Sequence, residues 1–323
     1  MLAIGESKRI ARRDGTAGSK IFSYNTYRNY WEHIKYFIRY IRVNHPEVTL
    51  LKKARKYVVE WLQYRENYIK KDGRHYSAWT MHTSAKALCK LFGIKPGDPD
   101  YYVPPKRNRE DIIQSRSKNR GISGKNNGEF IEFCKSTGLR RHEIQKLKGS
   151  DLITKEEIEA ALQKFQGREL LSEKEFRWKE ILEDANMFEE QYFLYVKGKG
   201  GRERLSPIIG PNTDEMIKRI RETNPDENVW KHVNTKADIH SFRAEYAGRI
   251  YKKYARNIED IPYDKNYPNS EKKYQSEVFK LHNELKGKML DKKAMLYCSK
   301  ALGHNRINVV ANNYNRFIFE EDR

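Results

Sequence analysis

Cysteine and long apolar runs are scarce in this chain of 323 residues. Its three cysteines, Cys89, Cys134 and Cys298, lie far apart and form no Cys-x-x-Cys pair, which argues against a disulfide framework or a structural zinc site and fits a reducing cytoplasm. No run approaches the roughly 18 apolar residues needed to cross a bilayer. Met1 to Lys20 has no apolar segment of the kind that secretory signals carry. We therefore expect a cytoplasmic protein that is not embedded in a membrane.

Positive charge is in large excess. The chain has 64 Lys and Arg against 44 Asp and Glu, a formal net charge of +20 at pH 7. Like charges repel one another in a compact fold unless a polyanion offsets them. A nucleic-acid backbone is the commonest such partner, and an anionic membrane is the second. Residues 1–110 carry 23 basic and 10 acidic residues, so +13 of the total lies there, and we expect this part of the chain to contact phosphates.

The length of the chain fits two domains of about 100–200 residues each. Residues 1–21 are small, polar and basic, and we interpret them as an N-terminal arm. Residues 22–103 contain three stretches with apolar side chains at helical spacing, which predicts a helical domain. A stretch rich in turn residues and proline ends it. We therefore assign residues 104–110 to a linker and residues 111–323 to a second domain.

The three helices expected in the first domain have recognisable limits. The first begins at Ser23, the second after Thr49 and the third after Ser77. The third ends at Gly93, because glycine readily takes the left-handed conformation that follows a helix. We expect the apolar stripe of the first helix to pack into the core. Its members are Tyr27, Tyr30, Trp31, Ile34, Phe37, Ile38 and Ile41.

The second domain combines helices with one hairpin. Residues 127–136 and 141–148 predict two helices, and residues 152–190 predict an acidic helical segment that is either a protein-docking face or a solvated spacer. Alternating apolar residues at 192–196 and 203–209, joined by a glycine-rich turn, predict a β-hairpin. The remainder is expected to be helical apart from one polar loop. The predicted fold class is therefore mainly α with a small β-hairpin or sheet (α+β).

Four short segments of the second domain carry candidate chemistry. Taken singly each is weak, since a glycine-rich tip is usually a flexible turn and a His-x-x-Arg usually a turn of surface charge. In chain order they are Ser136-Thr-Gly-Leu-Arg-Arg-His-Glu-Ile144, Val196-Lys-Gly-Lys-Gly-Gly-Arg-Glu-Arg204, His240-Ser-Phe-Arg243 and Leu302-Gly-His-Asn-Arg-Ile307, with Tyr314 after them. This order resembles the catalytic domain of the tyrosine recombinase (phage integrase) family, in which Arg, Lys, His-x-x-Arg, Leu-Gly-His and Tyr follow one another.

The resemblance covers most of the chain. Residues 22–94 are similar to the helical core-binding domain of the family and about 111–323 to its catalytic domain, while the segments 151–199 and 243–302 are longer than in a minimal member. It implies two domains that form a C-shaped clamp around duplex DNA. It also implies a catalytic set of Arg140, Lys199, His240, Arg243, His304 and Tyr314, with Tyr314 as nucleophile and neither metal nor cofactor.

The chemistry explains why these residue types are needed. Attack on a phosphodiester builds negative charge on its non-bridging oxygens, and the planar, always charged forks of Arg140 and Arg243 are suited to stabilise it. A tyrosine hydroxyl has a pKa near 10 and attacks poorly unless a base or nearby charge helps it. By resemblance, Tyr314 forms a 3′-phosphotyrosine and frees a 5′-hydroxyl, so rejoining needs no ATP.

The remaining roles also follow from the resemblance. Lys199, with Lys197 as the nearby alternative, protonates the departing oxygen. His240 is a base or phosphate ligand that shares one helix face with the arginine three residues on, and His304 hydrogen-bonds the phosphate. Glu143 is expected to support the preceding catalytic arginine through an ion pair. No Asp/Glu cluster with metal-ligand spacing accompanies these residues, which disfavours a two-metal nuclease.

We therefore expect a site-specific DNA recombinase that integrates or excises a mobile genetic element. The resemblance implies that four protomers on two DNA sites form the active assembly. It would be associated with the nucleoid when bound, and an accessory DNA-bending or excision factor stays open as a further partner. A type IB topoisomerase-like or telomere-resolving enzyme, and a catalytically inactive basic DNA-binding protein, remain the alternatives. The tail at residues 315–323 contains Phe317, Ile318 and Phe319, which are expected to dock on their own domain or on a neighbouring protomer.

Overall fold

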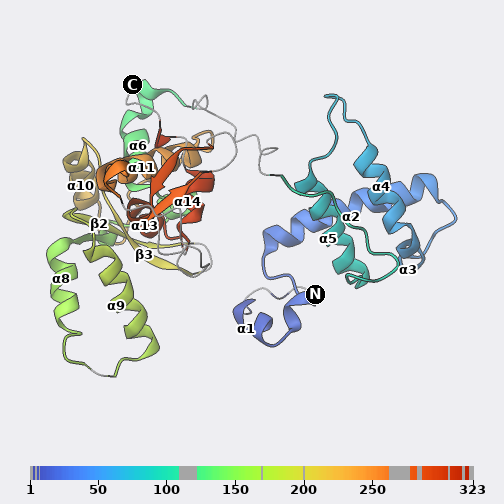
Figure 1. Cartoon of the computed structure of the whole chain (residues 1–323), viewed down its shortest axis with the longest axis horizontal. Coiled ribbons are helices and arrows are strands. Elements are labelled where there is room, and N and C mark those ends of the chain that lie inside the picture. Colours follow the sequence, from blue (N-terminus) through green and yellow to red (C-terminus); the bar gives the residue numbers. More distant parts are fainter. Residues whose placement is uncertain are drawn as a thin grey trace. The chain divides into compact units, whose positions relative to one another are not determined.

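The computed structural model describes residues 3, 6, 8–108, 122–168, 170–198, 201–261, 277–281, 286–304, 306–314 and 317–319. The chain divides into two compact units, Met1–Gln114 and Ser115–Arg323, named here the N-terminal and C-terminal units. Most of the described secondary structure is helical and the strands are short and antiparallel (Figure 1). The predicted α+β class, mainly α, is therefore confirmed. Within the described residues no helix has both the length and the apolar character to cross a membrane.

The N-terminal unit is built from helices. They are α1 (Lys8–Arg13), α2 (Tyr24–Asn44), α3 (Leu51–Ala54), α4 (Val58–Asn67) and α5 (Ala78–Phe92), with short 3-10 turns at Thr16–Ser19 and Arg55–Tyr57. The second helix expected from the sequence is thus divided into α3 and α4. Helix α5 ends as predicted at Gly93, whose φ is 69°. In the core the ring of Phe37 lies edge-on to those of Trp61 and Phe92, with centroids 5.5 and 5.9 Å apart.

The apolar stripe predicted for α2 is only partly in this core. Ile34, Phe37 and Ile41 are buried, but Tyr27 is 38% and Trp31 47% exposed. The prediction is wrong for these two residues. Tyr30 and Ile38, also members of the stripe, are partly buried and pack against the core, so the rest of the unit covers only part of the predicted face.

The C-terminal unit combines helices with two small sheets. Its helices are α6 (Gly124–Thr137), α7 (Arg141–Ile144), α8 (Lys155–Gln163), α9 (Glu173–Asn186), α10 (Thr213–Glu222), α11 (Ile239–Tyr254), α13 (Lys292–Ala301) and α14 (Asn308–Asn313), with 3-10 turns at Gly149–Asp151 and Ile258–Asp260. Its strands are β1 (Leu152–Thr154), β2 (Tyr192–Lys197), β3 (Glu203–Pro207), β4 (Val278–Lys280) and β5 (Met289–Asp291). The helix predicted over 141–148 is shorter and ends at Ile144.

The predicted β2–β3 hairpin is confirmed, with Tyr195 opposite Leu205 and Val196 opposite Arg204. A third strand, β1, pairs with β2 on the other side, and β4 pairs with β5 in a region expected to be helical. Both were missed because three-residue strands are too short to show a period-2 pattern. The acidic segment forms α8 and α9, which lie side by side and extend from the sheet (Figure 1).

Helix α11 runs through the core of the C-terminal unit and packs against α6 and α13 (Figure 1). Its Phe242 joins the cluster that contains Phe133 of α6, and its Ala247 joins the cluster that contains Met295 of α13. Tyr246, also on α11, is fully buried and donates a hydrogen bond of 2.8 Å to the carbonyl of Pro207 at the end of β3. A helix held on several sides presents its polar side chains from a fixed position.

Candidate active site

The first site segment is a turn that ends α6. Gly138 has a φ of 59°, and a Cβ at this position would clash with the ring of Tyr246. Glycine is therefore required both by the left-handed backbone and by the close approach of the helix α11 side chain. The turn places Arg140 immediately before α7, where its side chain is 26% exposed.

A fully buried carboxylate organises the arginines around it. Glu143 accepts hydrogen bonds from the backbone N–H of Arg140 at 2.8 Å and from its Nη1 at 2.7 Å. Its two oxygens also accept from Nη1 and Nη2 of Arg204, at 3.2 and 2.9 Å. Burial alone would raise the pKa of Glu143, but the hydrogen bonds and charge of Arg204 hold that pKa well below its usual range. The expected ion pair between Glu143 and Arg140 is present and is shared with a second arginine.

Arg204 is the site residue that sequence reasoning missed. It lies on β3, is 6% exposed, and its Nε donates to the carbonyl of Ala301 at 3.0 Å. It thereby ties β3 to the end of α13. Strand β3 reads Glu-Arg-Leu-Ser-Pro, and this mixed pattern gives no sequence signal for a buried arginine.

Arg243 is the most enclosed cation of the site. It lies on α11, is 1% exposed, and donates from Nη1 to the carbonyl of Gly138 and from Nη2 to the carbonyl of Leu302. Its Nε lies 3.2 Å from the hydroxyl of Tyr314. Burial lowers the pKa of Arg243, yet a guanidinium stays charged at neutral pH because its ordinary pKa is so high.

The Leu-Gly-His turn positions His304. Gly303 has a φ of 69°, and a Cβ there would lie 2.8 Å from Cδ of Arg204. The backbone N–H of His304 donates to the carbonyl of Ser299 at 2.7 Å. Burial, followed by the charges of Arg243 and Arg140, lowers the pKa of His304 to about 3. The imidazole is therefore neutral at pH 7.

Tyr314 follows the short helix α14 and is 9% exposed. Its backbone N–H donates to the carbonyl of Val310 at 2.9 Å, and its hydroxyl lies 3.4 Å from Nε2 of His304. The same hydroxyl is the group that faces Nε of Arg243. The structure thus brings together four residues named from the sequence, Arg140, Arg243, His304 and Tyr314, although they come from separate segments.

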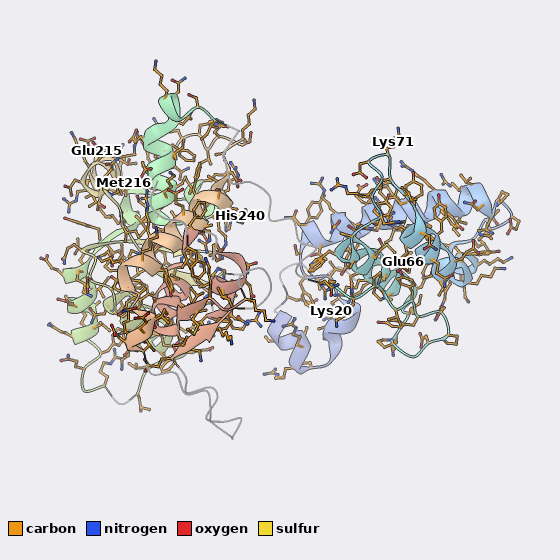
Figure 2. All side chains as sticks on the ribbon, turned by 45° about the horizontal axis from the view of Figure 1, so that its top comes forward. Lys20, Glu66, Lys71, Glu215, Met216 and His240 are labelled. Carbon is orange, nitrogen blue, oxygen red and sulfur yellow. The ribbon has the colours of Figure 1, made fainter. Side chains whose placement is uncertain are left out.

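The other two predicted catalytic residues, His240 and Lys199, are not among these four. His240, labelled in Figure 2, lies in the first turn of α11, is exposed, and makes no hydrogen bond or ion pair with a described residue. Lys199 lies outside the described residues. Its neighbour Gly198 is close to the site, because a Cβ on it would lie 2.9 Å from Oε1 of Glu143. Lys197 is exposed, with its Nζ 3.5 Å from Oε1 of Glu203.

Arg141 contacts backbone carbonyls, whereas its neighbour Arg140 pairs with Glu143. Its guanidinium donates to the carbonyls of Asn234 and Ala237, each at 2.6 Å. These carbonyls belong to the loop before α11. Arg141 therefore fixes the start of α7 to the start of α11, which keeps the Arg140 and Arg243 elements in register.

The site has an excess of positive charge. Arg140, Arg204 and Arg243 act on one carboxylate, Glu143, so these four groups sum to +2. The same three arginines, together with Arg202, lower the pKa of His304. Charge-assisted donors that converge on one place bind anions with oxygens in the guanidinium plane, such as a phosphodiester. Within the described part of the chain, no group of three His, Cys, Asp or Glu has the arrangement of a metal site.

The described part of the tail packs in cis. Ile318 is buried in the core of the C-terminal unit. Phe317 lies against α11 at Gly248, where an added Cβ would meet the Cβ of Phe317 at 2.9 Å and its carbonyl oxygen at 3.0 Å. A glycine inside a helix costs about 1 kcal/mol relative to alanine, and here it makes room for the tail.

No protein-family model matches the chain, and neither does any curated protein or solved structure. The function is therefore inferred from the geometry of the site together with the order of its motifs.

Proposed function

We propose that this chain is a site-specific tyrosine recombinase that cuts and rejoins DNA through a covalent 3′-phosphotyrosine. One observation carries the proposal. The hydroxyl of Tyr314 lies 3.2 Å from a buried guanidinium nitrogen of Arg243 and 3.4 Å from the imidazole of His304. A tyrosine held between an arginine and a histidine, next to two further arginines that share a single carboxylate, is suited to attack a phosphodiester.

In the proposed step the oxygen of Tyr314 attacks phosphorus, the bond from phosphorus to the 5′-oxygen breaks, and that oxygen takes up a proton. Arg140 and Arg243 stabilise the charge that builds on the non-bridging oxygens. The hydroxyl proton needs an acceptor. His304 lies 3.4 Å from the hydroxyl, but the lowered pKa of its imidazole makes it a weak base. We therefore assign the proton to His240, the base that the family resemblance suggests, and to His304 a hydrogen bond to the phosphate.

The leaving oxygen needs an acid, and the β2–β3 turn is the proposed source. Gly198 of this turn approaches Glu143 and Arg140. Lys199 follows it in the chain, and we assign to its ammonium group the proton that the 5′-oxygen receives. The reverse sequence, in which a 5′-hydroxyl attacks the phosphotyrosine, rejoins the strand without any outside energy source.

DNA is the proposed partner of both units. The net charge of +13 over residues 1–110 supports contact between the N-terminal unit and the phosphate backbone. A clamp of the two units around a duplex, and a tetramer on two sites that integrates or excises a mobile element, complete the proposal. Binding should weaken steeply with salt, because every phosphate contact releases counterions.

The proposal is tested by trapping the covalent intermediate. Duplexes that the chain binds are selected from a random-sequence library, nicked near the cut site, and incubated with protein without added metal. Wild type should give an adduct that survives SDS, and Tyr314→Phe should bind the same duplex but give none. Tyr192→Phe, which removes the hydroxyl of a tyrosine packed on Arg221 away from the site, is the matched control and should keep the adduct.

An adduct of equal yield in Tyr314→Phe would refute the assignment of the nucleophile. A bound, nicked duplex that never yields an adduct would favour a DNA-binding protein without catalysis. Adducts that resolve on a single duplex, without a paired second site, would identify a topoisomerase-like or telomere-resolving enzyme instead.

A further inference from the structure

A second arginine is buried without a carboxylate partner, far along the chain from the candidate active site. Arg65 of α4 is 7% exposed. No hydrogen bond or ion pair joins it to a described residue, and its Nε is fully enclosed without a hydrogen-bond partner. An uncompensated buried charge is strongly unfavourable. Such an arrangement is explained when an anion from outside completes it.

Three aromatic rings surround the guanidinium of Arg65. Its central carbon lies 4.0 Å from the ring centroid of Tyr76, 5.3 Å from that of Trp61 and 5.5 Å from that of Tyr36. Ring faces attract a cation, but they do not supply acceptors in the guanidinium plane, where its N–H groups point. These three rings, named here the aromatic collar, hold the cation in one orientation. Nε is fully enclosed, so the terminal nitrogens Nη1 and Nη2 are the donors left for the oxygens of a ligand.

Nearby acidic side chains are already engaged elsewhere. The carboxylate of Glu66, which follows Arg65 and is labelled in Figure 2, accepts a hydrogen bond from the hydroxyl of Tyr102. Glu60 of the same helix accepts from Tyr40. His33 shows the effect of the unneutralised charge, because burial and then Arg65 lower the pKa of this histidine to about 4.

The surface around Arg65 is basic and rich in tyrosine. The side chain of Arg39 lies 5.7 Å from the centroid of the Tyr36 ring, and Nζ of Lys70 lies 5.9 Å from that of Tyr76. Lys70 also lies 3.7 Å from Asp72, an ion pair at the surface that a phosphate can replace. Tyr36 itself is 49% exposed. Further along, the rings of Tyr64, Tyr68 and Tyr76 follow one another at centroid distances of 5.9 and 6.1 Å. Exposed tyrosine hydroxyls are additional donors to anionic oxygens.

We propose that Arg65, in its aromatic collar of Tyr36, Trp61 and Tyr76, binds one backbone phosphate of a nucleic acid, with Arg39 and Lys70 facing the neighbouring phosphates. A polyanion is favoured over a single carboxylate because the site offers three cations along one tyrosine-rich surface. That the nucleic acid is duplex DNA rests on the proposed function. The anion site itself rests only on the geometry of the N-terminal unit.

The test compares binding of a labelled duplex at several salt concentrations by fluorescence anisotropy. Arg65→Met fills the aromatic collar with an apolar chain but removes the charge and donors. It should weaken binding about tenfold near physiological salt, since a charge-assisted contact is lost, and should reduce the slope of log affinity against log salt by about 1. Arg177→Met is the matched control, because Arg177 is exposed on α9 of the other unit and paired with Glu173, and it should leave the slope unchanged.

Thermal unfolding separates this proposal from a purely structural role. If Arg65 is a ligand site, Arg65→Met removes an unpaired buried charge and should leave the melting temperature unchanged or raise it. A lower melting temperature with an unchanged salt slope would overturn the proposal. So would a duplex affinity that is unaffected while binding of polyglutamate falls, because the occupant would then be an acidic protein.

The adduct assay keeps the two proposals apart. With duplex in excess, Arg65→Met should still form the covalent adduct, because the residue is not part of the candidate active site. Weaker binding by Arg65→Met in a chain that never forms an adduct would support the phosphate site and reject the recombinase. An adduct from wild type, together with an unchanged salt slope in Arg65→Met, would support the recombinase and reject the phosphate site.

Discussion

Replacing Glu143 with glutamine tests the organisation of the arginine cluster. The carboxylate is fully buried and carries hydrogen bonds from both Arg140 and Arg204, whose side chains are 26% and 7% exposed. Glu143→Gln keeps the size and some hydrogen bonds but leaves the two guanidinium groups without a counter-charge. Removing one partner of a buried pair costs about 3–5 kcal/mol. We expect a cost at the lower end of this range, because the side chain of Arg140 can turn toward solvent.

The assay is calorimetric melting of the full chain. A loss of about 3 kcal/mol should lower the melting temperature of the C-terminal unit by roughly 6–12 °C. Glu222→Gln is the matched control. It breaks an ion pair with Lys218 whose side chains are 65% and 76% exposed, and a pair this exposed contributes about 0–1 kcal/mol. A Glu143→Gln chain that melts within about 1 °C of the control, on the same scale, would refute the reasoning.

The pH dependence of stability gives an independent check that the ionised carboxylate of Glu143 stabilises the fold. Because the folded-state pKa of Glu143 is depressed, its contribution is fully present above its unfolded pKa of about 4.3 and is lost as pH falls through the lower folded pKa. The stability difference between wild type and Glu143→Gln should therefore be constant from pH 5 to 7 and shrink in more acidic solution. A difference that grows on acidification would contradict the assignment.

Three further predictions follow from the same packing. In a urea titration, Gly138→Ala should lower the free energy of unfolding by about 2 kcal/mol or more, because the position combines a left-handed φ with a clash. The control Gly201→Ala, at a φ of 76° in open space, should lower it by about 1 kcal/mol. His304→Gln should flatten the stability profile between about pH 6.5 and 4, since the depressed pKa of His304 makes wild type lose stability as pH falls below the ordinary value of 6.5; equal melting-temperature profiles would contradict this. Gly248→Ala should displace the tail at Phe317 and reduce adduct yield while duplex affinity is kept, and an unchanged yield would show that the tail does not position the nucleophile.

Much of the architecture could be predicted from local patterns. Helix α5 with its stop at Gly93, helix α6 with its stop at Gly138 and the β2–β3 hairpin all depend on spacing and glycine within a few residues. The three-residue strands could not be found in this way. Their formation depends on partners elsewhere in the chain, as when Leu152 pairs with Leu194.

In the candidate site, too, some features follow from the sequence and others depend on contacts between distant segments. The sequence alone determined which residue types occur in which order, and this was sufficient to name Arg140, Arg243, His304 and Tyr314. Only the tertiary structure decided their environment. Arg243 is buried because carbonyls from the ends of α6 and α13 accept its N–H groups, and Arg204 belongs to the site because the buried carboxylate of a distant helix faces it. Solvation and charge pairing depend on which side chains meet, and those partners lie 59 to 105 residues apart in the sequence.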